Sequence, residues 1–232
     1  TSNLLIFFGL FSLIVSFPFI VLQNDLKRLL AYSSIEHTGI IYLGLGFGGF
    51  IGILGAFYHI FNHAILKSLM FFTAGSIIQV YETKEIAKIR GIFEKNKFLG
   101  CVFFLGGLGI CGMPPFGVFF SELMILIAGL KIKSYVAVCI YLLCLTFIFI
   151  GFLHHLSRTV FSHCQENNEN EEPGHVQEHN SEMRQPAGDG IIFGLTSKAA
   201  IVMLLLISMI SGFYMPDSLA AAISKAASII VK

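Results

Sequence analysis

The segment 52–80 is apolar and long enough to cross a lipid bilayer, yet it carries three titratable side chains. A membrane-crossing helix needs about 20 consecutive, mostly apolar residues. His59, His63 and Lys67 lie at four-residue intervals within this segment, and Lys67 is its sole formally charged residue. An ionisable group at the centre of a membrane helix costs about 2.5–3.5 kcal/mol on insertion scales. This segment therefore predicts a membrane protein with a polar interior.

The three side chains share one face if the segment is helical. A helix turns about 100° per residue, so positions i, i+4 and i+8 fall within about 80° of one another and rise about 6 Å per step. Such a row can pass a proton from one group to the next. Two other interpretations stay open, namely residues that only orient helices and a metal site on the paired histidines. Because the segment lacks the glutamate of an HExxH motif, no metal is expected.

The composition supports a location in the lipid bilayer and excludes several partners. Hydrophobic residues make up 55% of the chain and charged residues 12%, and the mean hydropathy is +0.79. The formal net charge is +1, so a nucleic-acid partner has no electrostatic support. The five cysteines show no CxxC or comparable spacing, so no cofactor is expected. We expect a membrane-embedded chain without a redox cofactor.

The apolar runs predict an all-α, polytopic bundle of about six crossings. Five runs are candidates for continuous crossings, and they cover 4–22, 29–50, 52–80, 135–161 and 191–215. The charged residues 81–97 should form an aqueous loop, and the polar stretch at 163–190 lacks the apolar residues needed to pack. We therefore divide the chain into a membrane repeat at 1–162, a polar loop at 163–190, and a last crossing with a short surface helix at 191–232.

The region 98–130 predicts one further crossing that is interrupted near its middle. Two apolar halves flank a break at Pro114, Pro115 and Gly117, and neither half alone spans about 30 Å. The prolines remove two backbone donors, and the freed carbonyls at membrane depth need partners from protein or water. Glu122 follows the break, which makes it a second candidate for proton transfer. Two short helices joined by an interfacial turn are the alternative.

Further polar residues lie within the run at 29–50 or just before it. Tyr32 is one helical turn before Glu36, and His37 follows directly. Polar side chains at this depth should face protein, so these three are candidate supporting residues. Lys27 precedes the run, where charged side chains are usually solvated or extend to the membrane surface. The pattern alone therefore gives Lys27 no role.

Several motifs in order resemble the antiporter-like membrane subunits shared by respiratory complex I, Mrp-type antiporters and energy-converting hydrogenases. They are Asp25-Leu-Lys-Arg-Leu-Leu-Ala-Tyr-Ser-Ser34, Ile35-Glu-His-Thr-Gly39, His59-Ile-Phe-Asn-His-Ala-Ile-Leu-Lys67, Phe71-Phe-Thr-Ala-Gly75 and Met113-Pro-Pro-Phe-Gly-Val-Phe-Phe-Ser-Glu122. Their order and spacing cover most of residues 1–162. Within the family, Ser34-Ile-Glu-His37 and Met215-Pro-Asp-Ser-Leu219 look most similar to component F of the hydrogenase-4 and formate hydrogenlyase type. Relatives in complex I more often carry Ser at the position of Glu36.

The resemblance implies a fold of two inverted five-helix repeats, each with an interrupted helix, within a longer subunit. This chain resembles the second repeat plus one further helix, and the implied N-terminal half has no counterpart in it. Residue by residue, the family's buried connecting lysine falls on Lys27. Its histidine and lysine relay falls on His59, His63 and Lys67, and the ionisable residue of the interrupted helix falls on Glu122. The resemblance thus replaces the solvated interpretation of Lys27.

The function that the resemblance implies is proton translocation in a membrane-bound hydrogenase complex of a prokaryotic inner membrane. The partners would be other membrane subunits of that assembly, whose redox chemistry drives proton transfer through this chain. A subunit of complex I or of an Mrp-type sodium/proton antiporter is one alternative. A truncated, structural subunit that conducts no protons is another, and Thr1 in place of an initiating Met favours missing upstream sequence.

Overall fold

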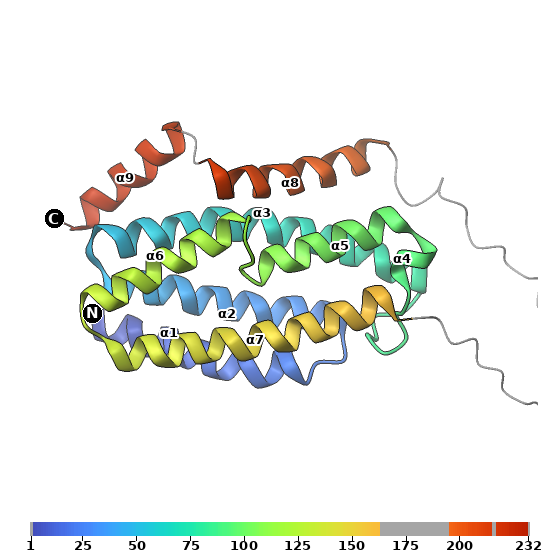
Figure 1. Cartoon of the computed structure of the whole chain (residues 1–232), viewed down its shortest axis with the longest axis horizontal. Helices are drawn as coiled ribbons and strands as arrows, with labels where there is room; N and C mark the ends of the chain where they lie inside the picture. Colours follow the sequence, from blue (N-terminus) through green and yellow to red (C-terminus); the bar gives the residue numbers. More distant parts are fainter. Residues whose placement is uncertain (1, 163–194, 215–216, 232) are drawn as a thin grey trace, which may run out of the picture.

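Long helices run side by side along one axis in the computed structural model, which describes residues 2–162, 195–214 and 217–231 (Figure 1). The helices are α1 (Ser2–Val21), α2 (Leu26–Phe47), α3 (Gly49–Tyr81), α4 (Ile92–Lys95), α5 (Lys97–Ile110), α6 (Gly117–Lys131), α7 (Tyr135–Phe161), α8 (Leu195–Phe213) and α9 (Asp217–Val231). Within these ranges the β-structure is an isolated bridge between Asp25 and Glu85. The predicted all-α fold class is confirmed.

The helix lengths agree with the predicted crossings. Helices α1, α3 and α7 and the segment Thr196–Phe213 of α8 are long and apolar enough to cross a membrane. Helix α2 has 22 residues and is also long enough to cross a membrane, but it is less apolar because it carries Lys27, Arg28 and Glu36. Helices α5 and α6, with 14 and 15 residues, together supply one broken crossing. Residues 163–190 lie outside the described residues, so the polar loop and the division into domains stay predictions.

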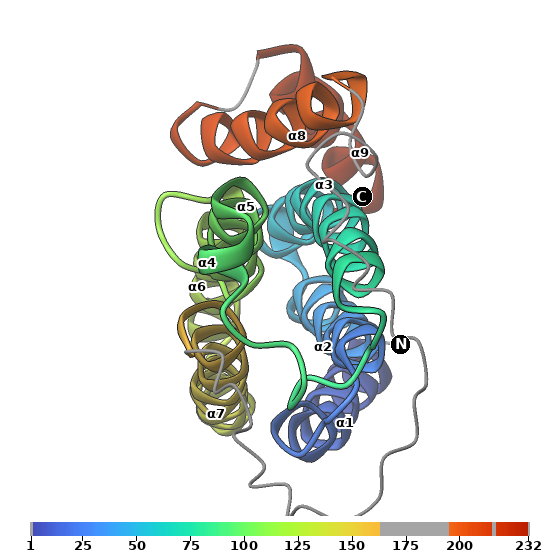
Figure 2. The same ribbon diagram turned by 90° about the vertical axis from the view of Figure 1, so that its right-hand side faces the viewer.

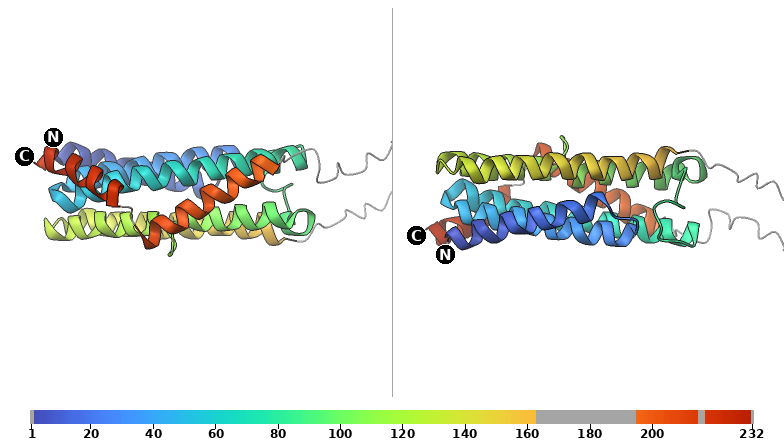
Figure 3. Two further views of the ribbon diagram at one scale, coloured as in Figure 1. Left: turned by 90° about the horizontal axis from the view of Figure 1, so that it is seen from above. Right: turned by 90° about the horizontal axis from the view of Figure 1, so that it is seen from below.

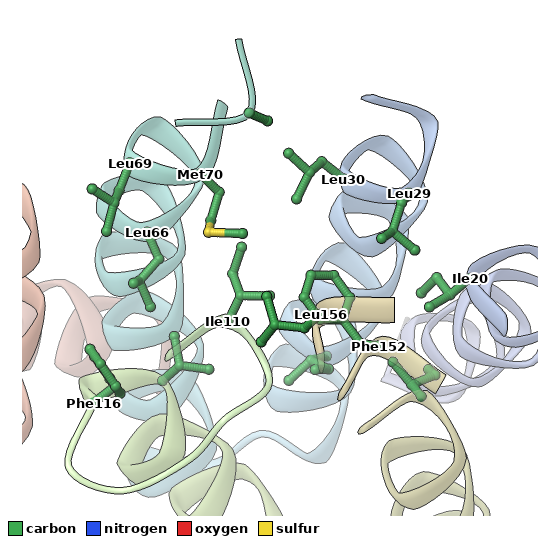
Figure 4. Close-up of a cluster of buried hydrophobic side chains, with 14 of the residues drawn as sticks. Ile20, Leu29, Leu30, Leu66, Leu69, Met70, Ile110, Phe116, Phe152 and Leu156 are labelled. Atoms are coloured by element: carbon green, nitrogen blue, oxygen red, sulfur yellow. The ribbon is translucent and has the colours of Figure 1, made fainter. Parts of the chain in front are cut away.

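The helices form two layers with an oblique cover. Viewed along the bundle, α1, α2 and α3 lie on one side and α5, α6 and α7 on the other (Figure 2). Helix α8 crosses obliquely over α3, α5 and α6, and α9 continues along α3 (Figure 3). Apolar side chains fill the space between the layers, where Leu66 and Met70 of α3 approach Ile110, Phe152 and Leu156 (Figure 4).

The break in the fifth crossing lies where the prolines predict it. Helix α5 ends at Ile110 and α6 begins at Gly117. The amides of Cys111 and Met113 donate to the last carbonyls of α5, and the amide of Phe116 donates to Met113, each at 3.1 Å. These amides of the break thus find acceptors within the protein, as membrane depth requires. Both halves pack along the uninterrupted α3, which supports one interrupted crossing over two helices joined at an interface.

The loop between α3 and α5 is anchored to the bundle by its apolar side chains. Ile86, Ile89 and Ile92 are buried. Its backbone also joins the start of α2, because the amide of Leu26 donates to the carbonyl of Lys84 at 2.9 Å. The predicted aqueous loop at 81–97 is therefore only partly correct, since it includes α4 and the first residue of α5. Charged side chains point outward while isoleucines fix the backbone.

Helices α1 and α2 are in close contact at two glycines. A Cβ atom placed on Gly9 would lie 2.8 Å from the carbonyl oxygen of Gly39 and 2.9 Å from Cγ of Leu43. A Cβ atom on Gly39 would lie 2.8 Å from the carbonyl oxygen of Gly9. Because lipid supplies no hydrophobic drive for helix association, small residues that permit close backbone packing stabilise such pairs.

We expect Gly9→Ala to destabilise the bundle by about 1–3 kcal/mol, because the added methyl group meets backbone that cannot move aside. The matched control is Gly75→Ala in α3, where a Cβ atom would meet nothing within 4 Å. Thermal unfolding in detergent measures both variants. An equal loss of stability in the two variants would contradict the close contact between α1 and α2.

Asp25 caps the first turn of α2 and carries its charge at the end of the bundle. Its side chain accepts hydrogen bonds from the amides of Lys27 at 2.9 Å and Arg28 at 3.1 Å, and Nζ of Lys84 lies 3.5 Å from Oδ2. Partial burial alone would raise the pKa of Asp25, but these hydrogen bonds and the Lys84 charge hold the pKa below its ordinary value. The ionised carboxylate therefore stabilises the fold above its ordinary pKa, and this contribution is lost as the pH falls through the lowered value.

Two substitutions of Asp25 distinguish the contribution of its helix cap from that of its charge. Asp25→Ala should cost about 1 kcal/mol, because the side-chain acceptor at the helix start is lost. Asp25→Asn keeps an acceptor and removes only the charge, so its loss at neutral pH should be smaller. The difference between wild type and Asp25→Asn in thermal midpoint should shrink as the pH falls below about 3.9. If wild type and Asp25→Asn differ in thermal midpoint by the same amount at neutral and acidic pH, the charge of Asp25 does not stabilise the fold.

Candidate functional site

Three imidazole rings meet between α2 and α3. His37 from α2 and His59 from α3 are fully buried, and Nδ1 of His37 lies 3.0 Å from Nε2 of His59. The ring centroid of His63, one turn further along α3, lies 4.7 Å from that of His37. The two histidines of α3 stack with their centroids 6.3 Å apart. The shared face predicted for His59 and His63 is confirmed, and His37 packs against both rings.

The hydrogen bonds around His59 indicate which ring nitrogens of His59 and His37 donate and which accept. Nδ1 of His59 lies 2.9 Å from Oγ of Ser121, and the Ser121 hydroxyl donates to the carbonyl of Val118 at 2.7 Å. With its hydrogen engaged there, Ser121 accepts from Nδ1–H of His59. Nε2 of His59 then accepts from Nδ1–H of His37. This tautomer assignment, inferred from the network, leaves Nε2 of His37 as a buried atom without a partner.

Lys67 is buried beside the backbone of α2. Its side chain is 6% exposed, and Nζ donates to the carbonyl of Leu30 at 2.6 Å and to the hydroxyl of Ser33. Electrostatic attraction also reaches Glu36, one turn further along α2. An outward-facing hollow along α3 is lined by the Lys67 side chain. Lys67 therefore joins α3 to α2 while its ammonium group interacts with an acidic side chain of the interior.

Glu122 lies in the second turn of α6, directly against the break. A Cβ atom placed on Gly112 would collide with Oε2 of Glu122, and Gly112 has a φ of +69°. Both the close approach and the left-handed backbone require glycine at this position. Oε1 of Glu122 is buried and has no hydrogen-bond partner. The break thus holds a carboxylate with a free acceptor at the level of the histidines.

A cavity of about 260 Å³ lies beside the two buried carboxylates. Glu36 and Glu122 line it together with Cys111 and Gly112 of the break, and α7 contributes further residues including Thr146. Thr146 is exposed, so the lining extends to the outer face of α7. Most of the lining is apolar, and Glu36, Glu122 and Thr146 supply polar atoms that could hold water molecules in a space of this size. The carboxylates therefore face a space that water can occupy.

Two of the residues named from the sequence lie outside this cluster. Lys27 lies in the first turn of α2 and its side chain is exposed, so the burial that the resemblance implied is not found. At this end of the bundle the described residues pack on the other side of the turn, where Leu26 and Leu29 are buried. Tyr32 stacks on Phe19 of α1 with ring centroids 4.8 Å apart. It packs two helices together, away from the histidines.

Sequence reasoning did not name Ser33, Ser121 or Tyr141. Ser121 directly precedes Glu122 inside an apolar helix, and that neighbourhood was a usable signal. The hydroxyl of Tyr141 is buried without a partner, in the neighbourhood of Glu122. A polar group within the crossing at 135–161 was the same kind of signal, but the sequence does not show that α7 brings Tyr141 near Glu122.

The arrangement is suited to short proton transfers separated by gaps. Ser121, His59 and His37 are joined by direct hydrogen bonds, whereas no direct hydrogen bond joins Lys67 to a ring of these described histidines. Imidazole can release a proton from one nitrogen and accept one at the other, which suits a relay. The gaps at Lys67 and Glu122 require water or a side-chain rotation. No redox or bond-forming group is needed for such transfer.

Comparisons with known proteins agree with this architecture. Residues 1–149 match the family described as "NADH:quinone oxidoreductase/Mrp antiporter, TM". A hydrogenase-4 component F homolog of Methylacidiphilum infernorum is 37% identical over 132 residues, which are 57% of this chain and 28% of that protein. A Na⁺/H⁺ antiporter subunit of Alkalihalophilus pseudofirmus is 30% identical over 135 residues, 58% of this chain and 26% of that protein. The match thus spans only about a quarter of these relatives.

Solved structures share the fold at low sequence identity. A chain of the Mrp complex from Dietzia matches with a TM-score of 0.80 and 18% identity, over all of this chain and 48% of its own length. A chain of respiratory complex I from Thermus thermophilus matches with a TM-score of 0.77 and 19% identity, over all of this chain and 45% of its own length. The chain is an integral membrane protein and belongs to the family of antiporter-like membrane subunits found in complex I, Mrp antiporters and membrane-bound hydrogenases.

Proposed function

We propose that this chain is the proton-translocating part of a membrane subunit in a hydrogenase complex of the hydrogenase-4 type. The observation that carries the proposal is the buried row of titratable groups from Lys67 through the histidines to Glu122. Such groups are costly inside a membrane and mark ion paths or proton relays. The row lies between α2, α3 and the broken helix, and its carboxylates line a cavity that can hold water.

Charge coupling gives the row a way to use energy from partner subunits. The Lys67 ammonium interacts with Glu36, so the charge of one group changes the stability of the charge on the other. Moving one elementary charge against 100 mV requires about 2.3 kcal/mol. Interactions between neighbouring buried charges are of this order or larger. Protonation of Glu36 from the cavity would therefore weaken the hold on the Lys67 charge and favour transfer of its proton.

The hydrogenase assignment rests on two features. The matched hydrogenase-4 component F homolog is 37% identical, compared with 30% for the matched sodium/proton antiporter subunit. Glu36, which belongs to the motif that resembles component F, lines the cavity beside Glu122. The partners would be the other membrane subunits of such a complex and the remaining part of the subunit. An inner membrane of a prokaryotic cell would be its location.

A sodium/proton antiporter subunit is the second candidate, because relatives with that printed description also match. Sodium prefers oxygen ligands, whereas nitrogen atoms dominate the cluster at Lys67 and the histidines. The candidates differ in a measurable way, since sodium transport would make the pH gradient of vesicles depend on external Na⁺. Proton uptake that is unchanged when K⁺ replaces Na⁺ would favour the hydrogenase assignment.

We expect Lys67→Ala and Glu122→Gln each to lower proton uptake per turnover by about tenfold or more, as loss of a proton-transferring group typically does. The measurement is acidification of vesicles that contain the complete membrane complex, with hydrogenase turnover recorded in parallel. Lys131→Ala is the matched control, because Lys131 is exposed at the end of α6. Unchanged proton uptake per turnover in both site variants would overturn the roles of Lys67 and Glu122. The same result would favour a structural subunit that conducts no protons.

A further inference from the structure

We propose that His37, His59 and Glu122 form a binding site for a divalent transition metal ion, and that Zn²⁺ bound there blocks the proton path. The three side chains are buried, and each offers one ligand atom such that all three atoms lie within 4.8 Å of one another. They come from α2, α3 and α6, so the helix packing creates the site. The i and i+4 histidines of α3, by contrast, do not form the pair.

The distances fit a metal ion after small side-chain rotations. Zinc binds imidazole nitrogen at about 2.0–2.1 Å and carboxylate oxygen at about 2.0–2.2 Å, so neighbouring ligand atoms of a tetrahedral site are about 3.4 Å apart. The nitrogens of His37 and His59 are already 3.0 Å apart. Oε1 of Glu122 has no hydrogen bond to lose. Its carboxylate can therefore turn toward the histidines at little cost.

The surrounding hydrogen bonds prepare both imidazoles for a metal ion. Ser121 accepts from Nδ1–H of His59, so Nε2 of His59 presents its lone pair to the site, as in metal sites whose second ring nitrogen is hydrogen-bonded. In the metal-free state Nδ1–H of His37 donates to that lone pair. Metal binding needs this hydrogen to move to Nε2 of His37, which has no other partner. The backbone of Ile110 lies near the His37 ring.

The donor set selects the type of ion. Two imidazoles and one carboxylate, with water in a fourth position, are a common zinc-binding arrangement. The cavity beside Glu122 supplies space for that water. Sodium and magnesium prefer all-oxygen ligands, whereas imidazole suits zinc, cobalt and nickel. We therefore expect Zn²⁺ and Co²⁺ to bind in competition with each other, and Mg²⁺ to leave the site free.

Blocking follows because the metal uses the same atoms that pass the proton. An ion held by Nε2 of His59 and Nδ1 of His37 replaces the hydrogen bond between the rings and occupies the free oxygen of Glu122. This inhibitory consequence rests on the proposed function. Metal binding does not, because it depends only on the geometry of the three side chains.

The test uses the purified membrane complex and two readouts. Co²⁺ titration should give an absorption spectrum typical of a tetrahedral nitrogen and oxygen site, and added Zn²⁺ should remove it. Glu122→Gln, His37→Gln and His59→Gln should each weaken Co²⁺ binding at this site by about 100-fold. His63→Gln is the matched control, since the His63 ring contacts His37 but supplies none of the three ligand atoms. Glu122→Gln also guards against misfolding, because it keeps the shape of the side chain.

The second readout is proton uptake by vesicles in the presence of Zn²⁺. Wild type should lose uptake at the Zn²⁺ concentrations that displace Co²⁺, and added chelator should restore it. Equal Co²⁺ spectra in wild type and in the Glu122, His37 and His59 variants would overturn the site, whatever the transport result. Zn²⁺ that displaces Co²⁺ while uptake continues would overturn the blocking role alone. Absence of uptake in metal-free wild type would instead count against the proposed function.

Discussion

A polar group buried in hydrocarbon must find its partner inside the protein, and this constraint organises the interior of the bundle. Lys67 reaches the carbonyl of Leu30 across the interface between α3 and α2. His59 binds both His37 and Ser121, and so joins α2, α3 and α6. The same contacts that position the titratable groups therefore also hold the helices in register.

The broken helix adds what continuous helices cannot supply. An unbroken crossing would satisfy its own backbone and leave no space beside Glu122. The turn at residues 111–116 opens the cavity, and Gly112 lets the carboxylate lie against the backbone. Helix α8 supports the far side of the break, where the Ser211 hydroxyl donates to Asn62 beside Gly117 at 2.5 Å. The break is thus packed from both sides.

Much of the fold could be predicted because bilayer thickness sets the length of each apolar run and adjacent prolines end a helix. The crossing predicted at 135–161 coincides with α7. Periodicity also placed His59 and His63 on one face, but it fixes only the face of each helix. It could not predict that His37 packs against both of them, since that depends on the register of α2 against α3. For Lys27 the motif led to a wrong prediction, because the resemblance implied a buried lysine and the side chain is exposed at the end of the bundle.

Helix α3 has 33 residues without interruption, so it is about 50 Å long, compared with a hydrocarbon layer of about 30 Å. His59 and Lys67 stand about 15 Å and 27 Å along it from Gly49. The imidazoles and the ammonium group therefore lie well inside the rod, several helical turns from each end. An ion or water molecule that reaches them from either end must therefore pass between the packed helices.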